Sequence, residues 1–376
     1  MADVAVCEVS HKKDFKKMNI NPSILYLLPN IGTVGGTVAK VKSTLEHTKY
    51  KVYISTPYNQ NNSQYIEEWE KHKNIKIIDL PERKNLFKSV LMLNKIIRKE
   101  EIRVVHSFFP IEMFIAFFLK LLNPQIKIVR SYEGNAKSSK AIIVASKIVL
   151  PFFDKVIFIS TYVSDFHSLL TKRCKSKQIV DNAAYNICNF SIKEKTEVCN
   201  IVSVAGLNEM KNVFMYAEIG KQLKAQGFVF NMKVVGDGPL YNELKERIEN
   251  YGIADVVKLE GKQIDPKPYY DEAYIYIHPA DIEGFGMTIV EAMSAGLPVI
   301  VSNMGGVPEL VENKKDGVIV DAYNPKEWVD AIIELYNNRE KYTTIAKNGY
   351  ETYRARFTPE IYANNLDKIY DTLIMQ

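Results

Sequence analysis

The chain has 376 residues, a length that suits two domains of ordinary size better than one. Hydrophobic residues make up 47% and charged residues 25%, which excludes a disordered or fibrous chain and fits a globular protein. The formal net charge of +5 divides into +13 for residues 1–190 and −8 for residues 191–376. This asymmetry predicts two domains with different partners, the basic one facing an anionic ligand or surface.

Several other classes of protein are excluded by the sequence. No run of 18 uncharged apolar residues occurs, so no membrane-spanning helix is predicted. Residues 1–20 are rich in lysine but have no apolar stretch after the lysines, so we expect a disordered leader rather than a signal peptide. The four cysteines have neither CxxC spacing nor histidine partners, which favours free thiols in a reducing cytoplasm over a zinc site or a disulfide framework.

Short apolar runs alternate with helical patterns along the chain, as in buried parallel strands joined by helices. The first series of runs comprises residues 23–29, 51–56, 75–80, 104–109, 126–132 and 155–160. The second series comprises residues 201–207, 231–237, 256–261, 273–279, 298–302 and 317–320. The sequence therefore predicts an α/β protein with two doubly wound, Rossmann-like domains that face each other.

The domain boundaries follow from a change of character after Lys175, where the chain becomes polar and irregular. We place the first domain at residues 1–185 and the second at residues 196–355, with the linker near residues 183–196. Residues 356–376 contain an amphipathic helical pattern, and we expect this helix to cross back to the first domain. Because ligands of open parallel sheets bind beyond the carboxyl ends of the strands, the loops after the strands are the candidate site.

Two helical windows of the first domain, residues 85–100 and 137–153, mix lysines with bulky apolar side chains. This combination is typical of a surface that lies on an anionic membrane. Ordinary amphipathic helices that pack on a sheet and keep their lysines in water have the same pattern. The sequence leaves both interpretations open, so we expect a cytoplasmic protein that can also lie on the inner face of the cell membrane.

The segment EGFGMTIVEAM holds the strongest functional signal. Glu283 and Glu291 have seven residues between them, and Gly284 and Gly286 accompany the first. Gly286 lets the backbone approach a ligand, and the free N–H groups of the following helix start form an anion site. A carboxylate on an apolar helix needs a partner, because its burial alone is costly. Bound hydroxyls or a nearby lysine would supply that partner for Glu291.

Weaker signals occur in three other loops that follow predicted strands. Gly236 and Asp237 lie in a glycine-rich turn, for which an ordinary strand-to-helix turn is the simpler explanation. Lys211 follows another strand and is able to hold a phosphate, although a single lysine is usually just solvated. Gly35 and Gly36 open a helix, but they match neither the GxGxxG nor the Walker pattern.

Together these elements resemble the EX7E signature of retaining glycosyltransferases with the GT-B fold, most closely the large family four (glycosyl transferases group 1). The resemblance is strong over residues 201–322 and weaker over residues 21–190. It implies that Glu283 meets the donor sugar, that Lys211 contacts the diphosphate, and that His106 takes part in catalysis. For His106, a strand-end histidine with satisfied hydrogen bonds is an equally good interpretation.

The resemblance also implies a donor site and an acceptor side. The residues expected to bind the nucleotide sugar are Gly35, Gly36, Gly236, Asp237, Gly286, Met287, Thr288 and Glu291, the last of these through the ribose. Arg130 and Glu133, in the loop where many members have a histidine, are the candidates on the acceptor side. Gly206 stands where the family often has an arginine, so one cationic contact to the diphosphate is missing.

The predicted activity is therefore transfer of a hexose-type sugar from a nucleotide-diphosphate sugar, UDP being favoured over GDP, with retention and without a metal or other cofactor. The expected acceptor is a glycan or a polyprenyl-phosphate-linked glycan of a bacterial surface polysaccharide. A nucleotide-sugar epimerase on the same fold and a catalytically weakened nucleotide-sugar-binding protein are the alternatives. Nucleic-acid binding is not expected, because no such motif accompanies the basic half.

Overall fold

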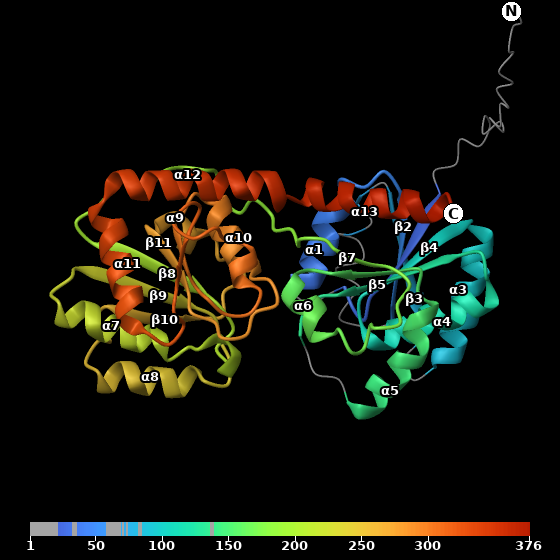
Figure 1. The fold of residues 1–376 in the computed structure, drawn as a ribbon, viewed down its shortest axis with the longest axis horizontal. Coiled ribbons are helices and arrows are strands. Elements are labelled where there is room, and N and C mark those ends of the chain that lie inside the picture. The colour runs from blue at the N-terminus through green and yellow to red at the C-terminus, as the bar shows by residue number, and fades with distance from the viewer. Residues whose placement is uncertain are drawn as a thin grey trace, which may run out of the picture.

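Two parallel β-sheets, each covered by helices on both faces, form the two lobes of the protein (Figure 1). The computed structural model describes residues 22–31, 36–57, 69, 71–72, 74–81, 85–135 and 139–376. The predicted α/β class with two Rossmann-like domains is confirmed. The expected leader, residues 1–20, lies outside the described residues.

The sheet of the first domain has the order β3-β2-β1-β4-β5-β6-β7 among the described residues, with all neighbours parallel. Its strands are β1 (Ser23–Leu27), β2 (Lys51–Pro57), β3 (Ile75–Leu80), β4 (Ile102–Ser107), β5 (Lys127–Tyr132), β6 (Lys155–Phe158) and β7 (Lys177–Ile179). Its helices are α1 (Gly36–Leu45), α3 (Leu86–Lys99), α4 (Pro110–Leu122), α5 (Lys140–Val149), η2 (Leu150–Phe152) and α6 (Thr161–Phe166).

The sheet of the second domain has the order β10-β9-β8-β11-β12-β13, again with all neighbours parallel. Its strands are β8 (Cys199–Val204), β9 (Phe230–Val235), β10 (Val257–Gly261), β11 (Ile275–His278), β12 (Val299–Ser302) and β13 (Val318–Val320). Its helices are η3 (Glu209–Lys211), α7 (Met215–Ala225), α8 (Tyr241–Asn250), α9 (Lys267–Glu272), α10 (Met287–Ser294), η4 (Val307–Glu309) and α11 (Pro325–Asn337).

Buried strands were predicted from the sequence, whereas an exposed strand was not. Every residue of β1 and β12 is buried, as expected for central strands of a sheet with helices on both faces. Strand β7 lies at the edge of the first sheet and all three of its residues are exposed. Its short sequence KQI has no apolar run, so the stretch was predicted to be irregular.

Two long helices at the end of the chain connect the lobes, α12 (Arg339–Arg356) and α13 (Pro359–Ile374) (Figure 1). The Thr358 side chain accepts a hydrogen bond from the Ile361 N–H, and Pro359 occupies the first helical position, so α13 has a well-formed start. Buried side chains of α13, including Tyr362 and Tyr370, belong to the hydrophobic core of the first domain. The last helix therefore crosses back to that domain.

The two domains are in direct contact beside the loop that follows β11. Ser160 of the first domain donates a hydrogen bond to the carbonyl of Gly284 at 2.7 Å. The Glu309 carboxylate of the second domain accepts hydrogen bonds from the backbone N–H groups of Thr161 and Tyr162, each at 2.7 Å, at the start of α6. Because an anion is favoured at a helix N-terminus, Glu309 links the domains at a charge-complementary contact.

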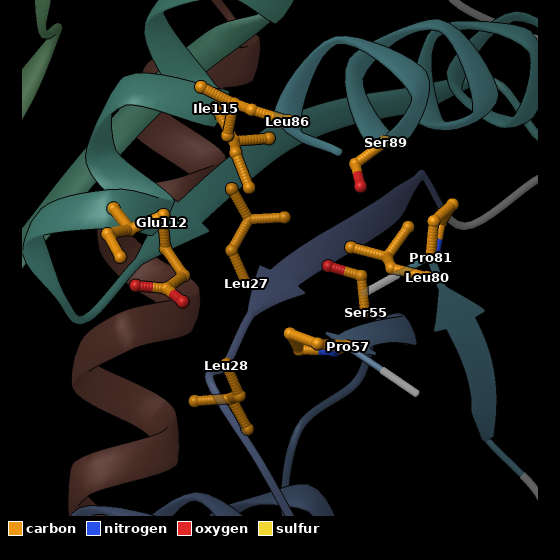
Figure 2. Close-up of a pocket in the computed structure, with 11 residues that line it drawn as sticks. Leu27, Leu28, Ser55, Pro57, Leu80, Pro81, Leu86, Ser89, Glu112 and Ile115 are labelled. Atoms are coloured by element: carbon orange, nitrogen blue, oxygen red, sulfur yellow. The ribbon is translucent and has the colours of Figure 1, made fainter. Parts of the chain in front are cut away.

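A small cavity lies among the carboxyl ends of β1, β2 and β3 and the helices α3 and α4 (Figure 2). Its lining includes Leu27, the last residue of β1, Leu28, which follows that strand, and Glu112 of α4. Its volume of about 10 Å³ is room for roughly one water molecule. We regard it as a gap in packing rather than as a ligand site.

Candidate active site

The loop between β11 and α10 presents the start of a helix to one edge of the second sheet. Gly286 has φ +104° and is the N-cap residue of α10. A Cβ at this position would lie 2.7 Å from Cδ1 of Ile289, so the turn requires glycine. The backbone N–H groups of Met287 and Thr288 donate to no other described residue. The predicted anion site at this helix start is therefore open to a ligand.

Glu283 lies beside this helix start and contacts two basic side chains. Its Oε2 atom forms an ion pair with Nζ of Lys211 and lies 3.3 Å from Nε2 of His278. Burial alone would raise the pKa of Glu283, but the hydrogen bond to His278 and the charge of Lys211 outweigh it and hold the pKa well below its usual range. Glu283 is thus ionised and able to accept hydrogen bonds from hydroxyl groups.

His278 is a site residue that the sequence analysis missed. It is the last residue of β11 and is almost fully buried, and burial lowers its pKa despite the neighbouring Glu283. Its Nδ1 atom lies 3.1 Å from the hydroxyl of Tyr276, which is hydrogen-bonded to Thr288 Oγ1 at 2.7 Å. A polar residue at the carboxyl end of a central strand, five residues before Glu283, was the available signal.

Glu291 lies one turn into α10, as predicted, and is partly buried. One of its carboxylate oxygens accepts a hydrogen bond from Tyr270 at 2.9 Å. Burial raises the pKa of Glu291 to about 7, and the hydrogen bond from Tyr270 offsets this only in part. A carboxylate with a raised pKa on an apolar helix at a loop edge is typical of a ligand-binding group.

The glycine-rich turn at Gly236, Asp237 and Gly238 has a clear packing role. Gly236 has φ +146°, and a Cβ there would lie 1.9 Å from the carbonyl oxygen of Ala205. A Cβ on Gly238 would lie 2.3 Å from the carbonyl oxygen of Leu207. These glycines let the loop after β9 pack directly on the loop that leads to Lys211, which agrees with the structural explanation of this turn. Its predicted role in donor binding stays a prediction.

The glycine pair at Gly305 and Gly306 supports the backbone of the Glu283 loop. The Gly306 N–H donates to the Glu283 carbonyl at 2.8 Å. A Cβ on Gly305 would lie 2.6 Å from that same carbonyl oxygen, and a Cβ on Gly306 would lie 2.5 Å from the Gly284 carbonyl oxygen. The position of Glu283 therefore depends on two residues that carry no side chain.

The two residues predicted on the acceptor side, Arg130 and Glu133, line one pocket of the first domain. Glu133 forms an ion pair with Lys40 of α1, whose ammonium group is fully buried. The sequence analysis did not single out Lys40.

Of the two glycines predicted to bind the donor in the first domain, Gly36 is the first residue of α1, whereas Gly35 lies outside the described residues.

His106 has hydrogen-bond partners on both sides of its ring. Its side chain is fully buried in the core of the first domain, on β4. Nδ1 lies 2.6 Å from the hydroxyl of Tyr370 of α13, and Nε2 lies 2.7 Å from the Ser131 hydroxyl. Both ring nitrogens have partners, which agrees with the alternative of a satisfied strand-end histidine, and the predicted catalytic role stays a prediction.

Comparison with known proteins finds a family model that matches part of the chain. Residues 189–352 match the family model described as glycosyl transferases group 1. The match covers most of the second domain and less than half of the chain. Over 368 residues, 94% of this chain and 97% of its relative, the sequence is 26% identical to an uncharacterized glycosyltransferase of Methanocaldococcus jannaschii. A putative colanic acid biosynthesis glycosyltransferase of Escherichia coli is 33% identical over 157 residues, 39% of each chain.

Solved glycosyltransferase structures share the whole two-domain fold. A glycosyltransferase of Rickettsia africae has a TM-score of 0.78 and 18% identity, over 95% of this chain and 99% of its own. HepE of Anabaena in complex with UDP and glucose has a TM-score of 0.76 and 18% identity, over 93% of this chain and all of its own. The two domains of this chain thus have the arrangement of these structures, which is known as the GT-B fold.

Three of the predicted absences concern metals, membrane spans and disulfides. Within the described residues, no group of three or more His, Cys, Asp or Glu side chains is placed to hold a metal ion. In that same part of the chain, no helix is both long enough and apolar enough to cross a membrane. Cys174, Cys188 and Cys199 are free thiols, and Cys7 lies outside the described residues.

Proposed function

We propose that this protein transfers a hexose-type sugar from a nucleotide-diphosphate sugar to a glycan or lipid-linked acceptor, with retention and without a metal. The observation that carries the proposal is the arrangement at the start of α10. Glu283 precedes and Glu291 follows two backbone N–H groups that no other described residue uses, and the ammonium group of Lys211 pairs with Glu283. A sugar linked through a diphosphate to a ribose matches this order of groups.

The residues have distinct roles in the proposed reaction. The diphosphate binds at the N–H groups of Met287 and Thr288 and at Lys211, which stabilise the charge that develops on the leaving group. Glu283 accepts hydrogen bonds from donor sugar hydroxyls, and Glu291 accepts them from the ribose. With these roles, Glu283 and Glu291 are the two glutamates of the EX7E signature of family four.

The transfer itself breaks one bond and forms another. The acceptor hydroxyl oxygen bonds to the anomeric carbon while the bond from that carbon to the phosphate oxygen breaks. The nucleoside diphosphate leaves with the electron pair, and its phosphate takes the proton of the acceptor hydroxyl. Retention requires that the incoming and leaving oxygens share one face of the sugar.

Known relatives support the choice of donor and pathway. HepE was solved with UDP and glucose, which supports a UDP-sugar. A relative 32% identical over 133 residues is named as a GDP-mannose-dependent mannosyltransferase, so GDP belongs in any test. The colanic acid relative supports a role in the synthesis of a bacterial surface polysaccharide. The epimerase alternative has no comparable support.

The test is a thermal-shift series with UDP, GDP, ADP and their common sugars, on the wild type and on Glu291→Ala. A nucleotide that binds only the folded state raises the melting temperature by mass action. We expect one nucleotide to stabilise the wild type and not the variant. No shift with any nucleotide would overturn the proposal and favour a protein that has lost its donor site. Gly206, which stands where the family often has an arginine, would then be the first residue to examine.

A further inference from the structure

The first domain contains a large pocket, and none of the donor residues that the structure describes is part of its lining. Its volume is about 590 Å³, within the range of small-molecule binding sites. It lies among the start of α4, the end of β5 and the helices α5 and α6. Its walls are mainly apolar, formed by side chains that include Phe108, Met113, Ile142, Ile143 and Leu170.

One end of this pocket holds a buried cation with unused hydrogen-bonding capacity. Arg130 is only 4% exposed, and its buried Nε donates no hydrogen bond to another described residue. Nη1 reaches the carbonyl of Ser107 at 3.4 Å, near the limit for such a bond. Leaving a buried donor unsatisfied is costly, and more so for a charged group, so this geometry indicates an acceptor atom that a ligand supplies.

The charges around Arg130 are of both signs, because the carboxylates of Glu133 and Glu112 act on it. Glu133 is in the same lining, but Lys40 pairs with it. Glu112, whose charge also acts on Arg130, belongs to the lining of the small cavity of Figure 2 and not to this pocket. Lys147 of α5 adds a second cation to the lining. A phosphate group would satisfy the guanidinium and meet an excess of positive charge.

The apolar walls continue to the surface of the protein. Leu169 and Phe166, which line the pocket, are 81% and 42% exposed. Val144 and Ile148 on the outer side of α5 are 61% and 65% exposed. Apolar side chains exposed together beside a pocket indicate a ligand with a hydrophobic part that enters from this side. A glycan alone would leave these walls without a matching partner.

The same pocket adjoins the Glu283 loop of the second domain. Gly134 belongs to the pocket lining, and a Cβ on Gly284 would lie 3.2 Å from the Cα of Gly134. His167 is also in the lining, and its Nε2 atom lies 2.9 Å from the carbonyl oxygen of Gly134. This contact holds the segment that follows β5. A molecule bound in the pocket would therefore lie next to the residue that meets the donor sugar.

We infer that this pocket binds an amphiphilic acceptor, with its hydrocarbon chain against α5 and α6 and a phosphate group at Arg130. The inference rests on the proposed function, because it makes the pocket the acceptor subsite of the glycosyl transfer. It names the residues that select the acceptor: Arg130 for the phosphate and Ile143 for the chain. Neither residue belongs to the donor site at α10.

Isothermal titration calorimetry of the full chain tests the inference with decyl phosphate below its micelle concentration. Decyl maltoside, with the same chain and no charge, and inorganic phosphate, with no chain, are the comparison ligands. We expect decyl phosphate to bind at one site, decyl maltoside at least about tenfold more weakly, and inorganic phosphate not measurably. Equal binding of inorganic phosphate would overturn the inference, because it would make the pocket a simple phosphate site.

Two variants on α5 separate the pocket from the surface. Ile143→Asn, which lies in the lining, should weaken decyl phosphate binding at least about fivefold. Val144→Asn, on the same helix but outside the lining, should leave it unchanged. Equal losses in both variants would show adsorption to the apolar surface and would overturn the inference.

Arg130→Gln should weaken decyl phosphate binding at least about tenfold and leave decyl maltoside binding unchanged. The thermal shift that the nucleotide produces, measured on the same samples, shows that each variant is folded. Nucleotide binding without decyl phosphate binding in the wild type would overturn the acceptor pocket alone. Absence of both would overturn the proposed function with it.

Discussion

Lys211 and Glu283 come from different loops, 72 residues apart in the chain, and form an ion pair at the start of α10. Each side chain is less than one-fifth exposed, so the pair is held in a defined geometry. The carboxylate fixes the position of the ammonium group before any ligand arrives. A preorganised cation beside open backbone N–H groups is what the departure of a diphosphate requires.

Replacing Lys211 by methionine should slow transfer by a factor of ~10²–10³, because one stabilising contact to the leaving group is lost. The measurement is the turnover rate with the nucleotide sugar found in the thermal-shift series. Lys224→Met is a matched control, because Lys224 forms an exposed ion pair with Asp255. A wild-type rate in Lys211→Met would contradict the role given to this lysine.

Gly236→Ala should destabilise the second domain by about 4 kcal/mol or more, since the new Cβ would overlap the carbonyl oxygen of Ala205. Urea denaturation measures the loss. Gly227→Ala is the control: Gly227 also has a positive φ, +70°, but no atom lies within 4 Å of its Cβ position. It should cost only about 1 kcal/mol. Similar losses in both variants would show that backbone strain, and not the collision, dominates.

Much of the fold could be predicted from the sequence because buried parallel strands are continuous apolar runs between helical patterns. The Glu283 loop was also predictable, since glycines and carboxylates next to an apolar helix conflict with ordinary core packing. Two contacts could not be predicted, the pairing of Lys40 with Glu133 and the contact of His278 with Glu283. The first joins distant segments, and no local pattern encodes it.

His106 shows what a sequence motif leaves open. Histidine at a strand end resembled a family position, but the side chain lies between Tyr370 and Ser131 in the core. The helix that supplies Tyr370 begins more than 250 residues later in the chain, at Pro359. Sequence spacing alone therefore could not show that both ring nitrogens have partners.

His106→Ala should lower the free energy of unfolding by roughly 3 kcal/mol, because it creates a cavity and leaves two hydroxyl groups without their partner. The turnover rate of the folded variant should stay within about tenfold of the wild type. Urea denaturation and turnover, measured together, separate the two effects. His47→Ala, at an exposed position, should change neither. A stable variant with a strongly reduced rate would instead support the catalytic role.

Glu309→Ala should weaken the contact between the domains by about 2 kcal/mol, because two hydrogen bonds to its carboxylate at the start of α6 are lost. Small-angle X-ray scattering without nucleotide should show a larger radius of gyration than for the wild type. Glu312→Ala, which removes an exposed carboxylate paired with Lys315, should leave the radius unchanged. An unchanged radius in Glu309→Ala would mean that the remaining apolar contacts hold the domains together without this link.

The raised pKa of Glu291 should make stability depend on pH. Burial raises this pKa from 4.5 to about 7, so between these values the folded state binds more protons than the unfolded state. The contribution of Glu291 to stability therefore falls as pH rises from about 4.5 to 7 and is constant above that. The difference in free energy of unfolding between the wild type and Glu291→Gln should decrease across this window. A constant difference would show that Glu291 titrates normally.

Nucleotide binding should show the opposite trend, because ribose hydroxyls donate to the ionised carboxylate. Affinity of the wild type for its nucleotide should rise as pH increases from 6 to 8, as the Glu291 carboxyl group loses its proton. Glu291→Gln should bind more weakly and should retain only the pH dependence of the diphosphate itself, so it is also the control for that titration. Calorimetry at three pH values measures both proteins. Parallel pH profiles would contradict the contact between Glu291 and the ribose, since the variant cannot change charge at this position.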